Sequence, residues 1–367
     1  MLCLVFVSVI LFSCKAETKE YGVNEYRTTM EYYDGFKIMQ LADLHFGIES
    51  DLALQMNVIE KSVIEADPDL IILTGDNFMY GNKAIADQLF ALMNSLCKRL
   101  SEEDANGRIT KFAVTFGNHD NQGDYPRYYL NEVISSYAAK DGEELETGKF
   151  AAFVDHEDDK LFGLTNYFID LVDDRSKGTD TVDVKYRIHL IDSNTYHFMG
   201  LDYDYDVIHA EQLEHAKKIY EKATADRNYV GMCFFHIPFE EYELAATQYK
   251  SASDPSLVGQ GENREEVLDP YENNGSFRAL RDANIVSFVV GHDHINCSDI
   301  VYNKDGEFKD RAILSYGVKA TDQVYHDKDM LGYKTITLED ISAEEFVTIE
   351  NVTKNFKNVR TGAQKYD

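Results

Sequence analysis

Short apolar runs alternate along this chain with longer segments whose apolar residues recur at helical spacing. The runs that predict buried strands are residues 36–42, 69–75, 111–116, 186–193, 229–235 and 285–290. The segments that predict helices are residues 52–66, 85–100, 209–223 and 275–283. Strands that alternate with helices are typical of βαβ units with a largely parallel sheet.

Two regions depart from this alternation. Residues 138–185 hold acidic, glycine-containing loops around one strand expected at 164–172, near a sheet edge. The segments 311–317, 332–339 and 344–352 alternate in the manner of antiparallel strands. The sequence shows no internal repeat and no long flexible linker, so we expect one domain over about residues 30–355, with two sheets layered with helices.

Residues with metal-ligating side chains follow five of the buried strands at the point where each strand ends. They are Asp43 and His45, then Asp76, then Asn118, His119 and Asp120, then His236, and finally His292 and His294. A single histidine after a strand is more often an ordinary loop residue than a ligand. Ligands of open α/β sheets, however, bind at the carboxyl ends of the strands, so we expect this whole set to meet at one edge. Because His292 and His294 are two positions apart, both can point to one centre in an extended turn.

Carboxylate, imidazole and amide side chains are ligands for Zn, Fe or Mn rather than for a soft thiolate site. The set is too large for one tetrahedral ion, so the sequence favours two metal ions that share a bridging carboxylate. A pair of ions roughly 3.5–4 Å apart can clamp a phosphate group and lower the pKa of a shared water.

The ordered motifs Asp-x-His, Gly-Asp, Gly-Asn-His-Asp, His and Gly-His-x-His resemble those of the calcineurin-like metallophosphoesterases. The flanking segments "FKIMQLADLHFG", "FFHIPFEEY" and "VVGHDHIN" are similar to the Dcr2 and plant purple-acid-phosphatase-29 branch. The resemblance covers about residues 35–320. It implies a four-layer α/β sandwich in which two mixed β-sheets are flanked by helices.

The resemblance also implies roles for individual residues. It assigns Asp43, His45 and His294 to the first metal, Asn118, His236 and His292 to the second, and Asp76 to a bridge between them. His119 would be the general acid, or would stabilise charge on the phosphoryl group, while a metal-bound hydroxide attacks phosphorus in line. Asp120 is expected to orient His119, with Asp293 as the alternative.

Two positions depart from the patterns of related enzymes. Met79 stands where purple acid phosphatases have an iron-binding tyrosine and where protein phosphatases have an orienting aspartate. His45 likewise replaces a feature of the purple type. A purple tyrosinate–iron centre is therefore not expected, and a phosphoprotein phosphatase is disfavoured.

Charge limits the partners of the protein. Asp and Glu total 65 against 36 Lys and Arg, a formal charge of −29, which repels nucleic-acid phosphates and anionic lipid. Nucleic-acid binding is not expected, but metal ions can invert the local field for a small phosphorylated substrate. The acidic stretch 202–206 resembles a calcium loop without its glycine and glutamate, so it is interpreted as a loop. The histidines that lack a strand-end position are not expected to be ligands: His189, His197, His209 and His215.

The first residues are apolar and then abruptly polar. Residues 1–20 are interpreted as a signal segment and tether, and "LFSC" at 11–14 resembles a bacterial lipobox with Cys14 as the lipidated residue. This predicts export, either as a cell-surface lipoprotein attached through Cys14 or as a secreted protein. The alternative is a buried N-terminal strand.

The sequence therefore predicts hydrolysis of phosphate esters, with phosphomonoesters favoured by the branch it resembles. A phosphodiesterase or nucleotide hydrolase on the same site is the main alternative. A non-catalytic metal-binding or phosphate-binding lipoprotein, and an interaction protein whose acidic loops bind a basic partner, are the others.

Overall fold

The computed structural model describes residues 26–123, 125–155, 161–173, 183–222, 229–255, 258–303, 306–307, 310–338 and 356–361. The expected signal segment, Cys14 and the strand expected at 344–352 lie outside these residues. The limits of the expected domain stay predictions. Among the described residues, no helix has both the length and the apolar character needed to cross a membrane.

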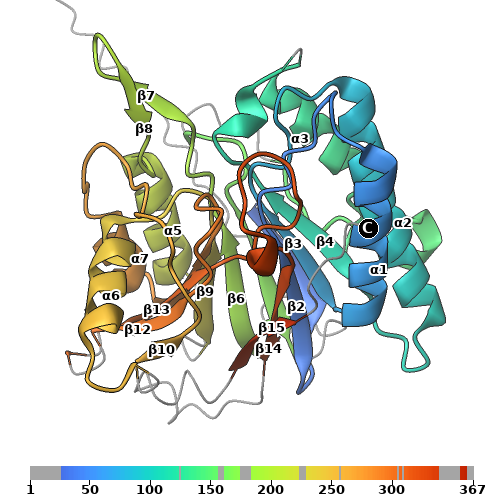
Figure 1. Ribbon diagram of the computed structural model, residues 1–367. Coiled ribbons are helices and arrows are strands. Elements are labelled where there is room, and N and C mark those ends of the chain that lie inside the picture. The colour runs from blue at the N-terminus through green and yellow to red at the C-terminus, as the bar shows by residue number, and fades with distance from the viewer. Residues whose placement is uncertain are drawn as a thin grey trace, which may run out of the picture.

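Two mixed β-sheets form the centre of the molecule, and helices cover their outer faces (Figure 1). The larger sheet has the strand order β1 (Arg27–Glu31), β5 (Tyr167–Val172), β6 (Val184–Leu190), β9 (Val230–Phe234), β11 (Ile285–Val290), β13 (Ala312–Tyr316), β12 (Asp299–Tyr302) and β10 (Gly259–Gln260). The smaller sheet has the order β15 (Phe356–Thr361), β14 (Tyr333–Leu338), β2 (Phe36–Leu41), β3 (Leu70–Thr74) and β4 (Lys111–Thr115).

The helices lie in two outer layers. Figure 1 shows α1 (Leu52–Ala66) and α2 (Lys83–Glu103) beside the smaller sheet, and α5 (Ala210–Lys222), α6 (Glu240–Ser251) and α7 (Ser276–Asp282) beside the larger one. Apolar side chains from both sheets belong to one buried cluster. The two sheets therefore pack face to face between the helices, and the expected fold class is confirmed.

The central strands are apolar throughout because both of their faces are covered. All five residues of β3 are buried, as are those of β4 and β9. This is the pattern of a parallel strand with layers on both sides, and β2, β3 and β4 do pair in parallel. Helices between them start at polar caps: Asp51 accepts from the Leu54 amide before α1, and Asn82 accepts from the Ile85 amide before α2.

Some expectations about individual elements were wrong. The stretch 202–206 is not only a loop, because Tyr203–Tyr205 forms strand β8, which pairs with β7 (Tyr196–Phe198) in a hairpin. Its alternation of tyrosine and aspartate is the period-two pattern of a strand with one apolar face. The strand β13 is antiparallel to β12 but parallel to β11, so the C-terminal part is not purely antiparallel.

Candidate metal centre

The carboxyl ends of β2, β3, β4, β9 and β11 bring together the seven residues expected to hold metal. All seven side chains are buried: Asp43, His45, Asp76, Asn118, His236, His292 and His294. Six of them form two groups in which one ligand atom from each residue lies within 4.8 Å of the others. We call Asp43, His45 and His294 the first triad, and Asp76, His236 and His292 the second triad.

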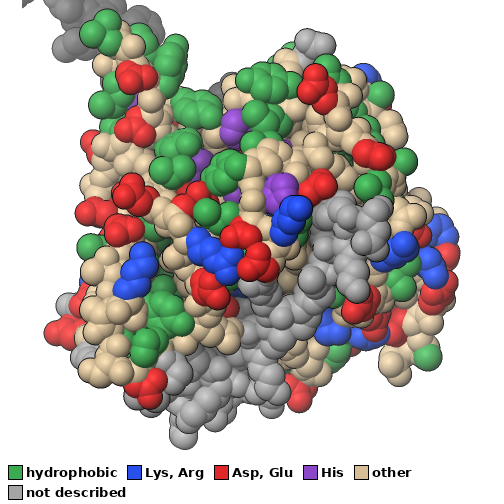
Figure 2. Space-filling model, in the orientation of Figure 1, with side chains coloured by type: hydrophobic (Ala, Val, Ile, Leu, Met, Phe, Trp, Pro, Cys, Tyr) green, Lys and Arg blue, Asp and Glu red, His purple; other side chains and the backbone are tan. Residues whose placement is uncertain are grey.

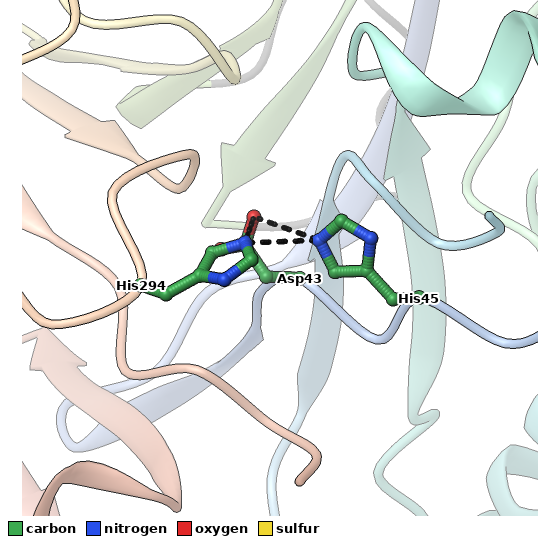
Figure 3. Close-up of side chains that lie close together, drawn as sticks. All are labelled: Asp43, His45 and His294. Atoms are coloured by element: carbon green, nitrogen blue, oxygen red, sulfur yellow. Dashed lines mark hydrogen bonds and ion pairs between the residues drawn. The ribbon is translucent and has the colours of Figure 1, made fainter. Parts of the chain in front are cut away.

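The first triad closes around a point between two imidazoles and a carboxylate (Figure 3). The Nε2 atoms of His45 and His294 are 3.0 Å apart. Asp43 Oδ1 lies 4.0 Å from the former and 3.7 Å from the latter. Three lone-pair donors thus converge without an intervening protein group.

The second triad lies directly beside the first. His236 Nε2 is 3.2 Å from Asp76 Oδ2 and 3.3 Å from His292 Nδ1. Asp76 Oδ2 is also 3.6 Å from His45 Nε2, so this carboxylate stands between the two triads. In the described part of the chain, Asn118 Oδ1 is buried without a hydrogen-bond partner, which leaves its lone pairs available to a cation.

The two histidines of the Gly-His-x-His motif belong to different triads. This division agrees with the assignments that the family resemblance implies, His294 to one ion and His292 to the other. The spacing of the motif alone did not separate the two rings. His292 takes a φ of 76°. Asp43, His45 and Asp76 have φ values of 57°, 49° and 48°, a region that non-glycine residues adopt at a cost.

Glycines in the motifs allow the strand ends to approach one another. A Cβ atom on Gly117 would lie 2.3 Å from Asp76 Oδ1, and one on Gly291 would lie 2.8 Å from Asp43 Oδ2. Both distances are far below van der Waals contact. The glycines before Asn118 and before His292 are thus packing requirements of the site.

Hydrogen bonds fix the orientation of the imidazoles. The Nδ1 atoms of His236 and His294 face the carbonyl oxygens of Thr74 and Tyr325, each at 2.9 Å. An Nδ1–H that donates to a carbonyl leaves Nε2 as a lone pair directed at the centre, which is the form that binds a metal. The buried Lys319 ammonium donates to the main-chain oxygen of Asp43 at 2.9 Å.

Burial sets the protonation of several of these groups. It lowers the pKa of His292 to about 3 and that of His294 to about 2, and it raises the pKa of Asp43 to about 6. Burial alone would raise the pKa of Asp76, but the charge and hydrogen bond of His236, together with the charges of His45 and His119, hold that pKa well below its ordinary value. Burial alone would lower the pKa of His236, but the Asp76 carboxylate raises it to about 9. A bound cation would take the place of the His236 proton. Imidazoles and carboxylates that converge in this way are the donor set of a divalent-metal centre, so the residues fit the expected ions.

A family-wide sequence model of calcineurin-like phosphoesterases matches residues 36–296. The chain belongs to the calcineurin-like phosphoesterase family. Phosphatase DCR2 of Saccharomyces cerevisiae is 26% identical over 297 residues, which are 77% of this chain and 47% of that protein. The chain thus spans about half the length of this relative.

The chain is also similar to a plant protein and to one of known structure. "Probable inactive purple acid phosphatase 29" of Arabidopsis thaliana is 23% identical over 290 residues, 71% of this chain and 67% of that protein. A dimetal phosphatase from Danio rerio, known by its structure, is 11% identical with a TM-score of 0.48, over 84% of this chain and 94% of that one. The resemblance to the Dcr2 and purple-acid-phosphatase-29 branch is confirmed.

His119 of this calcineurin-like chain differs from the triad residues in exposure. Its amide donates to Asp76 Oδ1 at 2.8 Å, and its Nε2 lies 3.9 Å from Asp76 Oδ2. Its side chain is 24% exposed, whereas those of His45, His236 and His294 are at most 4% exposed. The ring therefore borders the centre and also reaches solvent.

Asp120 lies against the loops rather than against the ring of His119. Its carboxylate accepts hydrogen bonds from the amides of Gly117 and Phe78 at 2.8 and 3.0 Å, and from Asn77 Nδ2 at 3.1 Å. The alternative, Asp293, accepts from the Tyr316 hydroxyl at 2.6 Å. No hydrogen bond or ion pair of the described residues joins either carboxylate to the His119 ring, so the expected orienting contact is not found there.

Four residues that the sequence did not single out lie against the family ligands. Lys319 follows the end of β13, as the expected ligands follow the ends of five other strands. It was not singled out because lysine is not a usual metal ligand. The other three are the tyrosines Tyr196, Tyr205 and Tyr325, which contact Asn118, His292 and His294. The histidines not expected to be ligands lie outside both triads: His189, His197, His209 and His215.

Proposed function

We propose that this chain hydrolyses phosphate esters with two bound metal ions, Fe, Mn or Zn, and that its substrates are small phosphomonoesters. The observation that carries this proposal is the pair of buried triads with the Asp76 carboxylate between them. Membership of the calcineurin-like family and the similarity to a yeast phosphatase support it.

The triads divide six of the residues between the two ions. The family resemblance assigns Asn118, whose Oδ1 has no hydrogen-bond partner among the described residues. The first triad would hold one ion, and His236, His292 and Asn118 the other, with Asp76 shared. Bound ions supply the positive charge that polarises the phosphoryl oxygens and activates a water for attack on phosphorus.

We assign His119 the role of supplying the proton to the leaving group. In hydrolysis, a water oxygen bonds to phosphorus while the bond from phosphorus to the ester oxygen breaks, and that oxygen needs a proton. The ring of His119 borders Asp76 and is exposed, so it can reach a substrate bound at the centre. We assign Asp120 to holding the loop that carries Asn118 and His119, since its carboxylate is hydrogen-bonded to that loop.

The test is an assay of the full chain, supplied with Mn²⁺, Zn²⁺ or Fe²⁺, on p-nitrophenyl phosphate beside bis-p-nitrophenyl phosphate. We expect faster cleavage of the monoester, loss of cleavage after chelation, and loss in the variant Asp76→Asn. The matched control Asp87→Asn changes a surface carboxylate that pairs with Lys83 and should keep full activity.

The other outcomes decide between the alternatives. Preference for the diester would keep the site and replace the substrate class by phosphodiesters or nucleotides. Bound metal without turnover of either compound would favour a non-catalytic metal-binding or phosphate-binding protein, as the name of the Arabidopsis relative would suggest.

Export also belongs to the proposal, with attachment of the chain to a membrane through a lipid on Cys14. The abrupt change from apolar to polar residues near Cys14 motivates it. Expression of the full chain in a bacterium, with fractionation and mass analysis of the N-terminal peptide, tests this. A Cys14→Ser variant that stays in the membrane fraction, or a Cys14 peptide of unmodified mass, would contradict it.

A further inference from the structure

Tyrosine side chains stand around the metal centre on two sides. Tyr196 and Tyr205 come from the β7–β8 hairpin, and Tyr325 comes from the segment before β14. Tyr196 and Tyr325 are exposed, and Tyr205 is half-buried. On this face, histidine side chains are visible with hydrophobic side chains, a class that includes tyrosine, and charged side chains near them (Figure 2). We call these three tyrosines the aromatic collar.

The tyrosines on each side of the collar contact a proposed metal ligand directly. On the hairpin side, the Tyr196 hydroxyl accepts a hydrogen bond from Asn118 Nδ2 at 2.7 Å. The Tyr205 ring packs edge-on against His292, with centroids 4.4 Å apart, and stacks beside Tyr196 at 5.7 Å. These contacts fix the two rings before any substrate arrives.

The opposite wall is fixed in the same way. The Tyr325 ring stacks on His294 with centroids 4.2 Å apart and an interplanar angle of 23°. The main-chain oxygen of Tyr325 faces His294 Nδ1 at 2.9 Å, and its side chain is hydrogen-bonded to Glu265. The ring is nevertheless 47% exposed, so part of its surface remains open to a bound molecule.

An exposed cation that the structure shows near Tyr325 is already paired, because Arg264 forms ion pairs with Asp327 and Asp329. Within the described residues, the hydrogen bonds and ion pairs of the two triads involve no Lys or Arg with an exposed side chain. Lys319 is the cation in contact, and its ammonium is buried and donates to the Asp43 main chain. The hairpin adds exposed carboxylates at Asp202 and Asp204. A further anionic group outside the centre would meet aromatic rings and negative charge.

We propose that the aromatic collar selects phosphomonoesters whose alcohol part is a neutral apolar or aromatic group, and disfavours sugar phosphates and polyphosphorylated compounds. The inference rests on the proposed phosphoester site. Rigid tyrosines offer large apolar contact area with little entropy to lose on binding. The phosphoryl group would sit at the triads while the apolar group packs between Tyr325 and the hairpin tyrosines.

Binding of two phosphonates to the metal-loaded full chain tests this inference. Phenethylphosphonate and ethylphosphonate carry the same anionic group and cannot be hydrolysed. The ratio of their Kd values, measured by calorimetry, therefore reports the contact of the phenyl group with the collar. We expect tighter binding of phenethylphosphonate by on the order of tenfold. The variants Tyr325→Ala and Tyr196→Ala should reduce this ratio toward one, and Tyr325→Phe should keep it.

Control variants separate a role of the tyrosines in substrate selection from a role in holding the metal ligands in place. Tyr249→Ala removes a tyrosine of α6 whose hydroxyl donates to the Gly261 oxygen, and it should keep the wild-type ratio. A purely structural role for Tyr325 would lower metal content and weaken both phosphonates equally, which would overturn the proposal. Equal Kd values for both compounds in the wild type would overturn it too. A preference for phenethylphosphonate without turnover of any ester would keep the collar and remove only the proposed hydrolase activity.

Discussion

Replacing His119 by alanine is the substitution that most sharply separates chemistry from metal binding at this centre. The imidazole is the exposed one beside Asp76, and it belongs to neither triad. The substitution also keeps the His119 main-chain amide, which donates to Asp76 Oδ1. We therefore expect His119→Ala to retain its metal content while turnover falls.

The size of the loss depends on the leaving group. A positioned general acid contributes about 10²–10⁴-fold, or about 3–5 kcal/mol of transition-state stabilisation. An alkyl alcohol needs the full contribution because its oxygen must be protonated as the bond breaks. The p-nitrophenolate ion leaves without a proton, so the rate on p-nitrophenyl phosphate should fall on the order of tenfold or less.

The assay compares kcat/KM of wild type and His119→Ala on phenethyl phosphate and p-nitrophenyl phosphate, with metal content measured in the same preparations. His209→Ala is the matched control, because that side chain is similarly exposed (28%) but pairs with Asp206 at 3.0 Å. An equal loss on both substrates would contradict the acid role and favour stabilisation of phosphoryl charge. Unchanged rates on both would remove His119 from the reaction.

Three further predictions concern the groups that support the centre. Asp120→Ala leaves the buried amides of Gly117 and Phe78 without their acceptor and removes one of the two acceptors of Asn77 Nδ2, so the free energy of unfolding measured in urea should fall by about 3 kcal/mol; an unchanged value would contradict the assigned loop role. Lys319→Met removes the donor to the Asp43 main chain and should lower metal content, whereas Lys334→Met, which removes another buried lysine, should leave metal content unchanged; equal metal content in both variants would refute this. The raised pKa of Asp43 means that the metal-free fold loses stability as the pH rises from about 4 through about 6, and a bound cation offsets this loss. The increase in Tm caused by Mn²⁺ should therefore be larger at pH 7 than at pH 5, and a larger increase at pH 5 would show the sign to be wrong.

The sequence predicted the fold and the position of the site well because both depend on strands buried on two faces. Such strands are continuous apolar runs, and the polar residue that ends each run marks the carboxyl edge of the sheet. The helix expected at 52–66 coincides with α1, because the apolar positions are regularly spaced and Asp51 caps its start. The edge strand β1 was missed because it is brief and largely polar although mostly buried, and the hairpin was missed because its strands are brief and mostly exposed.

Details within the site depended on features that residue type does not encode. The spacing of the Gly-His-x-His motif does not show that His292 and His294 belong to different triads, nor that His292 has a left-handed backbone conformation. The orienting role expected for Asp120 assumed that neighbours in sequence meet, whereas its carboxylate turns back to the loop amides. Tyr196 and Tyr325 lie far along the chain from the ligands that they contact, and no local pattern connects them.

The central claim is that two metal ions occupy the paired triads with Asp76 between them. Anomalous X-ray scattering from a crystal of the full chain grown with Mn²⁺ tests it most directly. The account predicts two peaks roughly 3.5–4 Å apart, one bounded by the first triad and one by the second, with the Asp76 carboxylate in contact with both. A single peak, or no peak at either triad, would contradict it.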